Sequence, residues 1–273
     1  MEGEVLQELL SLAPIFLLVA TRAFAMIETA PLLSSEAIPR IAKFGLAGFT
    51  AYAAFPSSLL TNPNAPAFSA YGLSFVFLII GEALIGIIIG FYITIIFSAF
   101  ATAGQFFSLQ MGFGASEAYD PLSQVENPLM GQYLNLVAML VFISLGGFGE
   151  LFLKGFWRSI QSLNIIDLID GREQVIAMLL TGLTWLFRDA LVIAMPILGT
   201  LFLTSLSTGL ISKAAPQVNL LSEGFPISIT VAFILIFATL PFMVEAFTRI
   251  IDGGFWAIQD LLAQIGVQIE GAL

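Results

Sequence analysis

Few residues in this chain of 273 could carry out acid–base, nucleophilic or metal chemistry. The absence of His and Cys excludes histidine catalysis, a Ser–His triad, disulfides, and imidazole or thiolate metal sites. The ionisable residue of most interest is Glu82, which lies in a long apolar stretch. A charge at the centre of a bilayer costs at least about 2.5–3.5 kcal/mol. Glu82 must therefore face protein, water or a partner. The same requirement applies less strictly to Arg22, Glu28, Asp189 and Glu245.

Two interpretations of these charges remain open. They pair with one another and hold helices together, or they relay protons. We favour structural pairing, and Glu82 is the residue of most interest in deciding between the two. No residue pattern in the chain predicts catalysis, a metal site or a cofactor.

The composition predicts an integral membrane protein. Hydrophobic residues make up 58% of the chain and charged residues 10%, whereas soluble domains average about 45–50% and about 25%. The mean hydropathy is +0.98. A net charge of −10 argues against a nucleic-acid partner and against docking on anionic headgroups.

The apolar stretches are long and lack strand-type alternation, so we expect one all-α, polytopic membrane domain over residues 1–273 with long, broken helical hairpins. Six candidate spans lie near residues 9–30, 41–60, 72–103, 133–153, 175–212 and 225–247.

Two of these spans are too long for a bilayer core of about 30 Å, because 72–103 and 175–212 would reach about 48 Å and about 57 Å. Such helices project beyond the membrane, tilt or break. Pro196 follows Arg188 and Asp189, which predicts a break near 188–196.

Small and hydroxyl residues recur every fourth position in the third and fifth spans. The third carries Glu82, Gly86, Gly90, Thr94, Ser98 and Thr102, and the fifth carries Thr200, Thr204, Thr208 and Ser212. Such stripes allow close approach of helix backbones. They indicate either internal packing of one bundle or faces that pack against other subunits or line a polar path.

The segment 104–121 is the most unusual stretch. Its first part combines Gly and Gln with bulky apolar residues and has no basic residue; it includes Gly104, Phe106, Phe107, Gln110, Met111, Gly112, Phe113 and Gly114. Irregular backbone at membrane depth is tolerated only when it is buried in protein or lines a cavity. Composition alone leaves two alternatives, a re-entrant or pore-plugging loop and an interfacial loop.

Two further segments follow the fifth span. Residues 213–226 predict a helix–helix connection that contains Pro216, Gln217, Asn219, Gly224 and Pro226, the last suited to a first helical turn. Residues 246–273 predict an amphipathic helix, with apolar residues at 255, 258, 261, 262 and 265. Because this tail is acidic, packing against protein is favoured over binding to a membrane surface.

Three separated motifs occur in an order that resembles the FliR family of flagellar biosynthesis proteins and its injectisome counterpart. They are Ala30-Pro31-Leu32-Leu33 with Ala37-Ile38-Pro39 and Lys43-Phe44-Gly45-Leu46; Gly104 to Gly112 with Asp120-Pro121; and Ala215-Pro216-Gln217-Val218-Asn219 with Gly224-Phe225-Pro226. The resemblance extends through nearly the whole chain.

This resemblance implies a non-enzymatic subunit of the type III secretion export gate in the bacterial inner membrane. FliR-type subunits join FliP and FliQ in a right-handed helical, heteromeric assembly around a closed pore, much of it above the membrane plane. The resemblance also implies that 104–121 is a plug inside the pore, that FlhB and FlhA are partners, and that unfolded flagellar or virulence proteins are the cargo. The rival hypotheses are a stand-alone secondary transporter that uses Glu82 or Asp189, and a membrane scaffold without a conduit.

Overall fold

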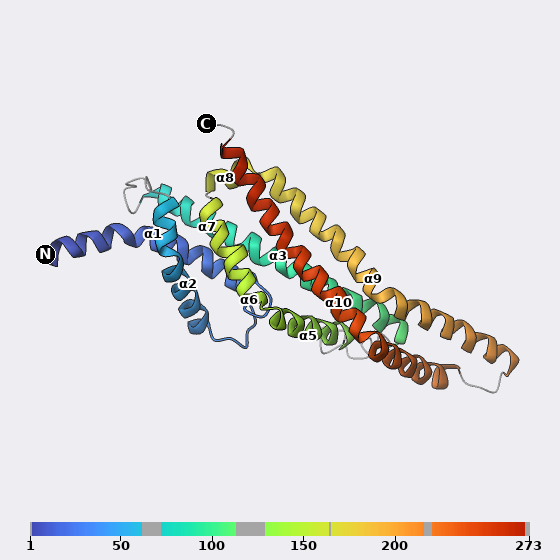
Figure 1. The fold of residues 1–273 in the computed structure, drawn as a ribbon. Helices are drawn as coiled ribbons and strands as arrows, with labels where there is room; N and C mark the ends of the chain where they lie inside the picture. The colour runs from blue at the N-terminus through green and yellow to red at the C-terminus, as the bar shows by residue number, and fades with distance from the viewer. Residues whose placement is uncertain (1, 62–71, 113–128, 164, 216–219, 271–273) are drawn as a thin grey trace. The chain divides into compact units, whose positions relative to one another are not determined.

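The computed structural model describes residues 2–61, 72–112, 129–163, 165–215 and 220–270 (Figure 1). The regular elements among them are all helices, which confirms the predicted all-α class. They are α1 (Glu2–Thr29), α2 (Arg40–Thr61), α3 (Leu73–Met111), α5 (Leu129–Ser144), α6 (Gly147–Glu150), the π-helix η1 (Leu151–Trp157), α7 (Arg158–Ser162), α8 (Ile165–Asp170), α9 (Arg172–Ala214) and α10 (Leu220–Glu270).

The chain folds into two compact units. Unit 1 contains Met1–Thr94, Gly146–Gly182 and Gly253–Leu273; unit 2 contains Ile95–Leu145 and Leu183–Asp252. The three longest helices, α3, α9 and α10, each contribute residues to both units.

The core of unit 1 forms where α1 packs against the first half of α3. Helix α1 also contacts α2, where the rings of Phe24 and Phe44 stack with centroids 4.4 Å apart. The end of α10 completes this core. Its buried residues are those that the helical period predicted, namely Phe255, Ile258, Leu261, Leu262 and Ile265.

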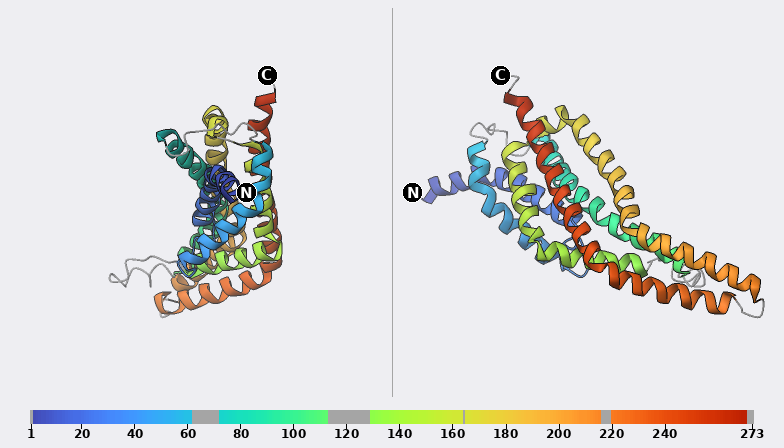
Figure 2. Two further views of the ribbon diagram at one scale, coloured as in Figure 1. Left: turned by 90° about the vertical axis from the view of Figure 1, so that its left-hand side faces the viewer. Right: turned by 45° about the vertical axis from the view of Figure 1, so that its right-hand side comes forward.

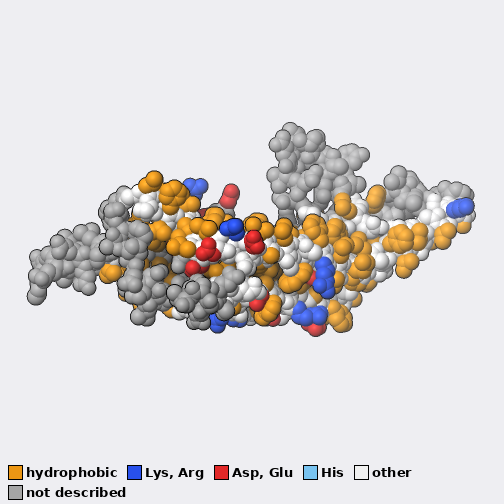
Figure 3. Space-filling view, turned by 90° about the horizontal axis from the view of Figure 1, so that it is seen from above, with side chains coloured by type: hydrophobic (Ala, Val, Ile, Leu, Met, Phe, Trp, Pro, Cys, Tyr) orange, Lys and Arg blue, Asp and Glu red, His pale blue; other side chains and the backbone are white. Residues whose placement is uncertain are grey.

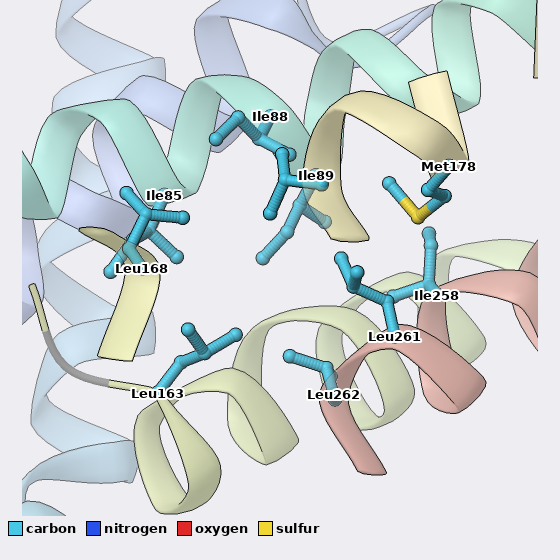
Figure 4. Close-up of a pocket in the computed structure, with 10 residues that line it drawn as sticks. Ile85, Ile88, Ile89, Leu163, Leu168, Met178, Ile258, Leu261 and Leu262 are labelled. Carbon is cyan, nitrogen blue, oxygen red and sulfur yellow. The ribbon is translucent and has the colours of Figure 1, made fainter. Parts of the chain in front are cut away.

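Helices α3, α8, α9 and α10 line a small apolar cavity in unit 1 (Figure 4). It is lined by Ile85, Ile88 and Ile89 of α3 together with Leu168, Met178 and side chains near the end of α10. The lining has no polar side chain, so the cavity offers a water molecule no hydrogen-bond partner.

The core of unit 2 is aromatic. The ring of Phe97 lies 5.4 Å from that of Phe142 on α5, and the ring of Phe100 lies 4.4 Å from that of Phe247 on α10. The second half of α9 and the first half of α10 run side by side in this unit (Figure 2). One face of each is buried, at residues that include Ala190, Ala194 and Ile197 on α9 and Ala232, Ile236 and Met243 on α10.

Large apolar side chains remain exposed over much of the described part of the molecule, and on the face shown in Figure 3 they lie among scattered Lys, Arg, Asp and Glu side chains. Phe237 and Phe242 on α10 and Ile41 on α2 are among the most exposed. A surface of this kind requires a membrane or other subunits to cover it.

The described residues contain fewer helices that could cross a membrane than the six spans predicted. Among the described residues, four helices are long and apolar enough to cross a membrane: Leu12–Thr29, Leu73–Met111, Arg172–Ala214 and Gly224–Ile265. The pair Leu129–Ser144 and Gly147–Ser162 would make a fifth, broken span. The predicted span 133–153 is therefore interrupted, because Gly146 adopts a positive φ of 70° and ends the helix there. The predicted span 41–60 is helical as α2, but Arg40, Lys43 and the polar residues near Pro56 lower its hydropathy.

The predicted break near 188–196 is wrong, since α9 is one helix of 43 residues with Pro196 inside it. One proline removes a single hydrogen bond from the helical ladder, and membrane-type helices tolerate this loss. Similarly, α10 runs without interruption for 51 residues, so the predicted tail helix 246–273 is its continuation. Pro226 lies within α10 rather than in its first turn.

Candidate functional site

A buried arginine joins three elements of unit 1. Arg22 of α1 is 3% exposed. Its Nε donates a hydrogen bond to Oε2 of Glu82 on α3 at 2.6 Å, its Nη1 donates to Oγ of Ser159 on α7 at 3.1 Å, and its Nη2 donates to the carbonyl oxygen of Leu163 at 2.9 Å. We call these four residues the Arg22 node. The planar guanidinium is suited to this role because its donors point in fixed directions.

The Arg22 node explains how the Glu82 carboxylate is tolerated in an apolar stretch of the chain. The Glu82 side chain is only 15% exposed and its carboxylate contacts a cation from its own chain. A buried charge is tolerated when it is paired and hydrogen-bonded. This geometry supports structural pairing rather than proton relay.

A second ion pair fixes the connection between α1 and α2. The Nζ of Lys43, which is buried, donates to Oε2 of Glu28 at 3.1 Å and to the carbonyl oxygen of Ser34 at 3.1 Å. The pair of Glu245 with Arg249 differs, because both side chains are exposed and 4.0 Å apart.

The first part of the four-residue stripe packs against α1 of the same chain. A Cβ added to Gly86 would lie 3.0 Å from Cβ of Ala25 and closer to the carbonyl oxygen of Arg22. Four residues later, a Cβ on Gly90 would lie 2.7 Å from the carbonyl oxygen of Met26. The hydroxyl of Thr94 then donates to the carbonyl oxygen of Thr29 at 2.7 Å. This half of the stripe follows the internal-packing alternative, so contact with another subunit is not needed to explain it.

The second stripe makes contacts of another kind. The hydroxyls of Thr200, Thr204 and Thr208 each donate to the carbonyl oxygen four residues earlier in α9, at 2.9, 2.9 and 3.0 Å. These bonds satisfy the hydroxyls within their own helix. Packing of this stripe, and of half-buried Ser98 and Thr102, against other subunits stays a prediction.

The segment predicted as a loop over 104–121 begins as helix. Residues 104–111 are the last two turns of α3, because the apolar positions continue at helical spacing and Phe107 and Met111 are buried in unit 2. A Cβ on Gly104 would lie 2.6 Å from Cα of Gly131 on α5, so this glycine allows close helix contact. Gln110 and Leu109 are exposed and Phe106 is half-buried.

Several predicted site residues lie outside the described residues, namely Phe113 and Gly114 with the rest of the loop to Pro121, and Pro216, Gln217 and Asn219. Sequence reasoning missed Ser159 and Leu163 as partners of Arg22, and it missed Phe225 as a contact of Gly112. Arg22 is the sole basic residue of its span, which is the signal that could have paired it with Glu82. Within the described ranges, no three carboxylates gather into a cation site.

The fold and the paired buried charges define an all-helical membrane protein. A family model for "Bacterial export proteins, family 1" matches residues 13–254. The flagellar biosynthetic protein FliR of Escherichia coli is 29% identical over 248 residues, covering 89% of this chain and 91% of its own length. FliR of Bacillus subtilis is 28% identical over 264 residues, covering 96% and 100%. The surface presentation of antigens protein SpaR of Shigella flexneri is 30% identical over 182 residues, covering 66% and 69%.

The chain belongs to the bacterial export proteins, family 1, the family of FliR and its injectisome counterpart. It is a component of a type III export apparatus located in a membrane.

Proposed function

We propose that this chain is a non-enzymatic subunit of the type III export gate in the bacterial inner membrane, at the flagellar basal body or its virulence counterpart. With FliP- and FliQ-type subunits it forms the closed conduit for unfolded secreted proteins, next to FlhB- and FlhA-type proteins. The observation that carries this proposal is the family match over residues 13–254. The relatives support both settings, since their names refer to flagellar biosynthesis and to surface presentation of antigens.

The Arg22 node supports this proposal over a stand-alone transporter. A carboxylate that couples transport to ions has to exchange its ion or proton during the cycle. The Glu82 carboxylate is instead held by Arg22, which also bonds Ser159 and Leu163. Releasing it would leave the guanidinium buried without a counter-charge, which is costly.

The end of α3 is the proposed contribution of this chain to closure. Phe107 and Met111 are buried in unit 2, so they hold the helix end in place rather than block a passage themselves. The side chains that remain available are Gln110, half-buried Phe106 and Leu109, which is 68% exposed. Apolar side chains close a constriction to ions by excluding water from it.

Leu109→Asp is therefore expected to let small ions leak through the assembled gate, because a carboxylate in the constriction retains water. The measurement is membrane conductance, or growth in high salt, in cells that express the chain with its partner subunits. Leu109→Met keeps an apolar side chain and should remain tight. If Leu109→Asp assembles normally and its conductance equals that of wild type, the constriction that stops ions lies elsewhere, in a partner subunit.

Deletion of the gene tests the function itself. We expect loss of secreted flagellar or virulence proteins from the medium, unchanged growth, and recovery when the wild-type gene is supplied. Continued secretion at the wild-type level in the deletion strain would contradict the proposal.

A further inference from the structure

The helix α3 ends in a way that requires glycine. Gly112 follows the last helical residue and has a φ of 89°, a region that strains residues with a side chain. Its N–H donates to the carbonyl oxygen of Leu109 at 3.2 Å, which closes the final turn. The backbone conformation that ends α3 is therefore set at this residue.

The ring of Phe225 packs against Gly112. A Cβ added to Gly112 would lie 3.4 Å from Cγ of Phe225 and closer still to Cδ1 and Cε1. The two residues are far apart in sequence but belong to the same compact unit, and they bring the start of α10 to the end of α3. The ring edge thus occupies the space that a side chain at 112 would need.

The start of α10 is stiffened around this ring. Phe225 precedes Pro226, whose own ring restricts the backbone of both residues. The hydroxyl of Thr230 donates to the carbonyl oxygen of Pro226 at 2.8 Å. Phe225 is still 41% exposed, so the ring is not simply part of the buried core of unit 2.

We infer that Phe225 is a positioning residue that holds Gly112 and so fixes the end of α3 in its closed arrangement. This inference rests on the proposed function, in which the end of α3 contributes to closure. It assigns a role to the Gly224-Phe225-Pro226 motif and makes the first turns of α10 the support against which α3 ends. A movement of that part of α10 would change the end of α3 through this contact.

The contact can be tested separately from export, because the chain contains no Cys. In the double variant Gly112→Cys with Phe225→Cys, the new sulfur at 225 stands near the former Cγ position, within disulfide reach of the new Cβ at 112. We expect a cross-link on oxidation of the assembled complex, and none in Gly112→Cys with Phe233→Cys. Both double variants carry the same strained Cys at 112, where φ is 89°, so the cross-link is scored in complexes recovered at the wild-type level. Absence of the cross-link in such a complex overturns the inference whatever the function of the gate.

The role is tested by ion leak. Phe225→Ala is expected to raise conductance roughly tenfold, the change in open population that about 1.4 kcal/mol produces. Phe225→Tyr retains the ring edge and should stay tight, as should Phe233→Ala on the same helix. If Phe225→Ala reduces recovery of the complex, Phe225→Leu replaces it, since leucine keeps apolar volume without a flat ring.

The outcomes separate the two proposals. A cross-link together with a leaky Phe225→Ala supports the inference. If the cross-link forms but the conductance of Phe225→Ala equals that of wild type, the inference about Phe225 is overturned. This holds even if Leu109→Asp leaks and supports the proposed closure by α3.

Discussion

Arg22→Met is expected to destabilise the protein more than any other single substitution considered. It leaves the Glu82 carboxylate buried without a cation and the Leu163 carbonyl oxygen without its donor. Removal of one partner from a buried ion pair typically costs about 3–5 kcal/mol. The melting temperature of the purified assembly and the amount of the chain in membranes should both fall sharply.

Two controls separate the ion pair from general damage. Arg249→Met removes an exposed arginine 4.0 Å from Glu245, and exposed pairs contribute little to stability, so this variant should match wild type. Arg22→Met combined with Glu82→Leu removes both charges and should recover part of the lost stability. Glu82→Gln alone leaves the guanidinium without a counter-charge and should also be unstable. Wild-type stability of Arg22→Met would show that the Arg22 node does not hold these helices together.

Gly86→Leu is expected to disrupt the packing of α1 on α3. Even a Cβ at this position meets the backbone of Arg22 and Met26, and backbone cannot move aside as a flexible side chain can. Overpacking of this kind typically costs about 1–3 kcal/mol, occasionally more. The chain should accumulate poorly, and recovery of its complex from membranes should fall accordingly.

Gly48→Leu on α2 is the matched control, because a Cβ there meets nothing within 4 Å. It makes the same chemical change in a helix and gains helix propensity. Recovery should therefore stay near wild type. Equal recovery of Gly86→Leu and Gly48→Leu would contradict close packing of α1 on this face of α3.

The all-α class and the positions of the long helices were predictable from the sequence, because long apolar runs without alternation specify membrane-type helices. The buried face at the end of α10 was predictable for a related reason: Phe255, Ile258 and Ile265 repeat at the helical period, and the structure buries them. Both patterns are local in sequence, so they can be recognised without knowing which elements pack against these helices.

The features that were missed depend on residues distant in sequence. Glu82 required a counter-charge, but its partner Arg22 is 60 residues away, and nothing in the spacing links them. Pro196 and Gly104 suggested a break and a loop, yet both lie inside continuous helices. Local helix-breaking tendencies were outweighed there by the tertiary packing of these helices, as the close contact of Gly104 with Gly131 shows.

The most direct test of the account is purification in mild detergent, with the chain expressed alone and together with its FliP- and FliQ-type partners. The many exposed apolar side chains, such as Phe237 and Phe242, lead us to expect a stable hetero-oligomer from co-expression and little stable protein from the chain alone. A chain that purifies by itself as a stable monomer or homo-oligomer, and does not bind these partners when they are present, would contradict the assignment as a gate subunit.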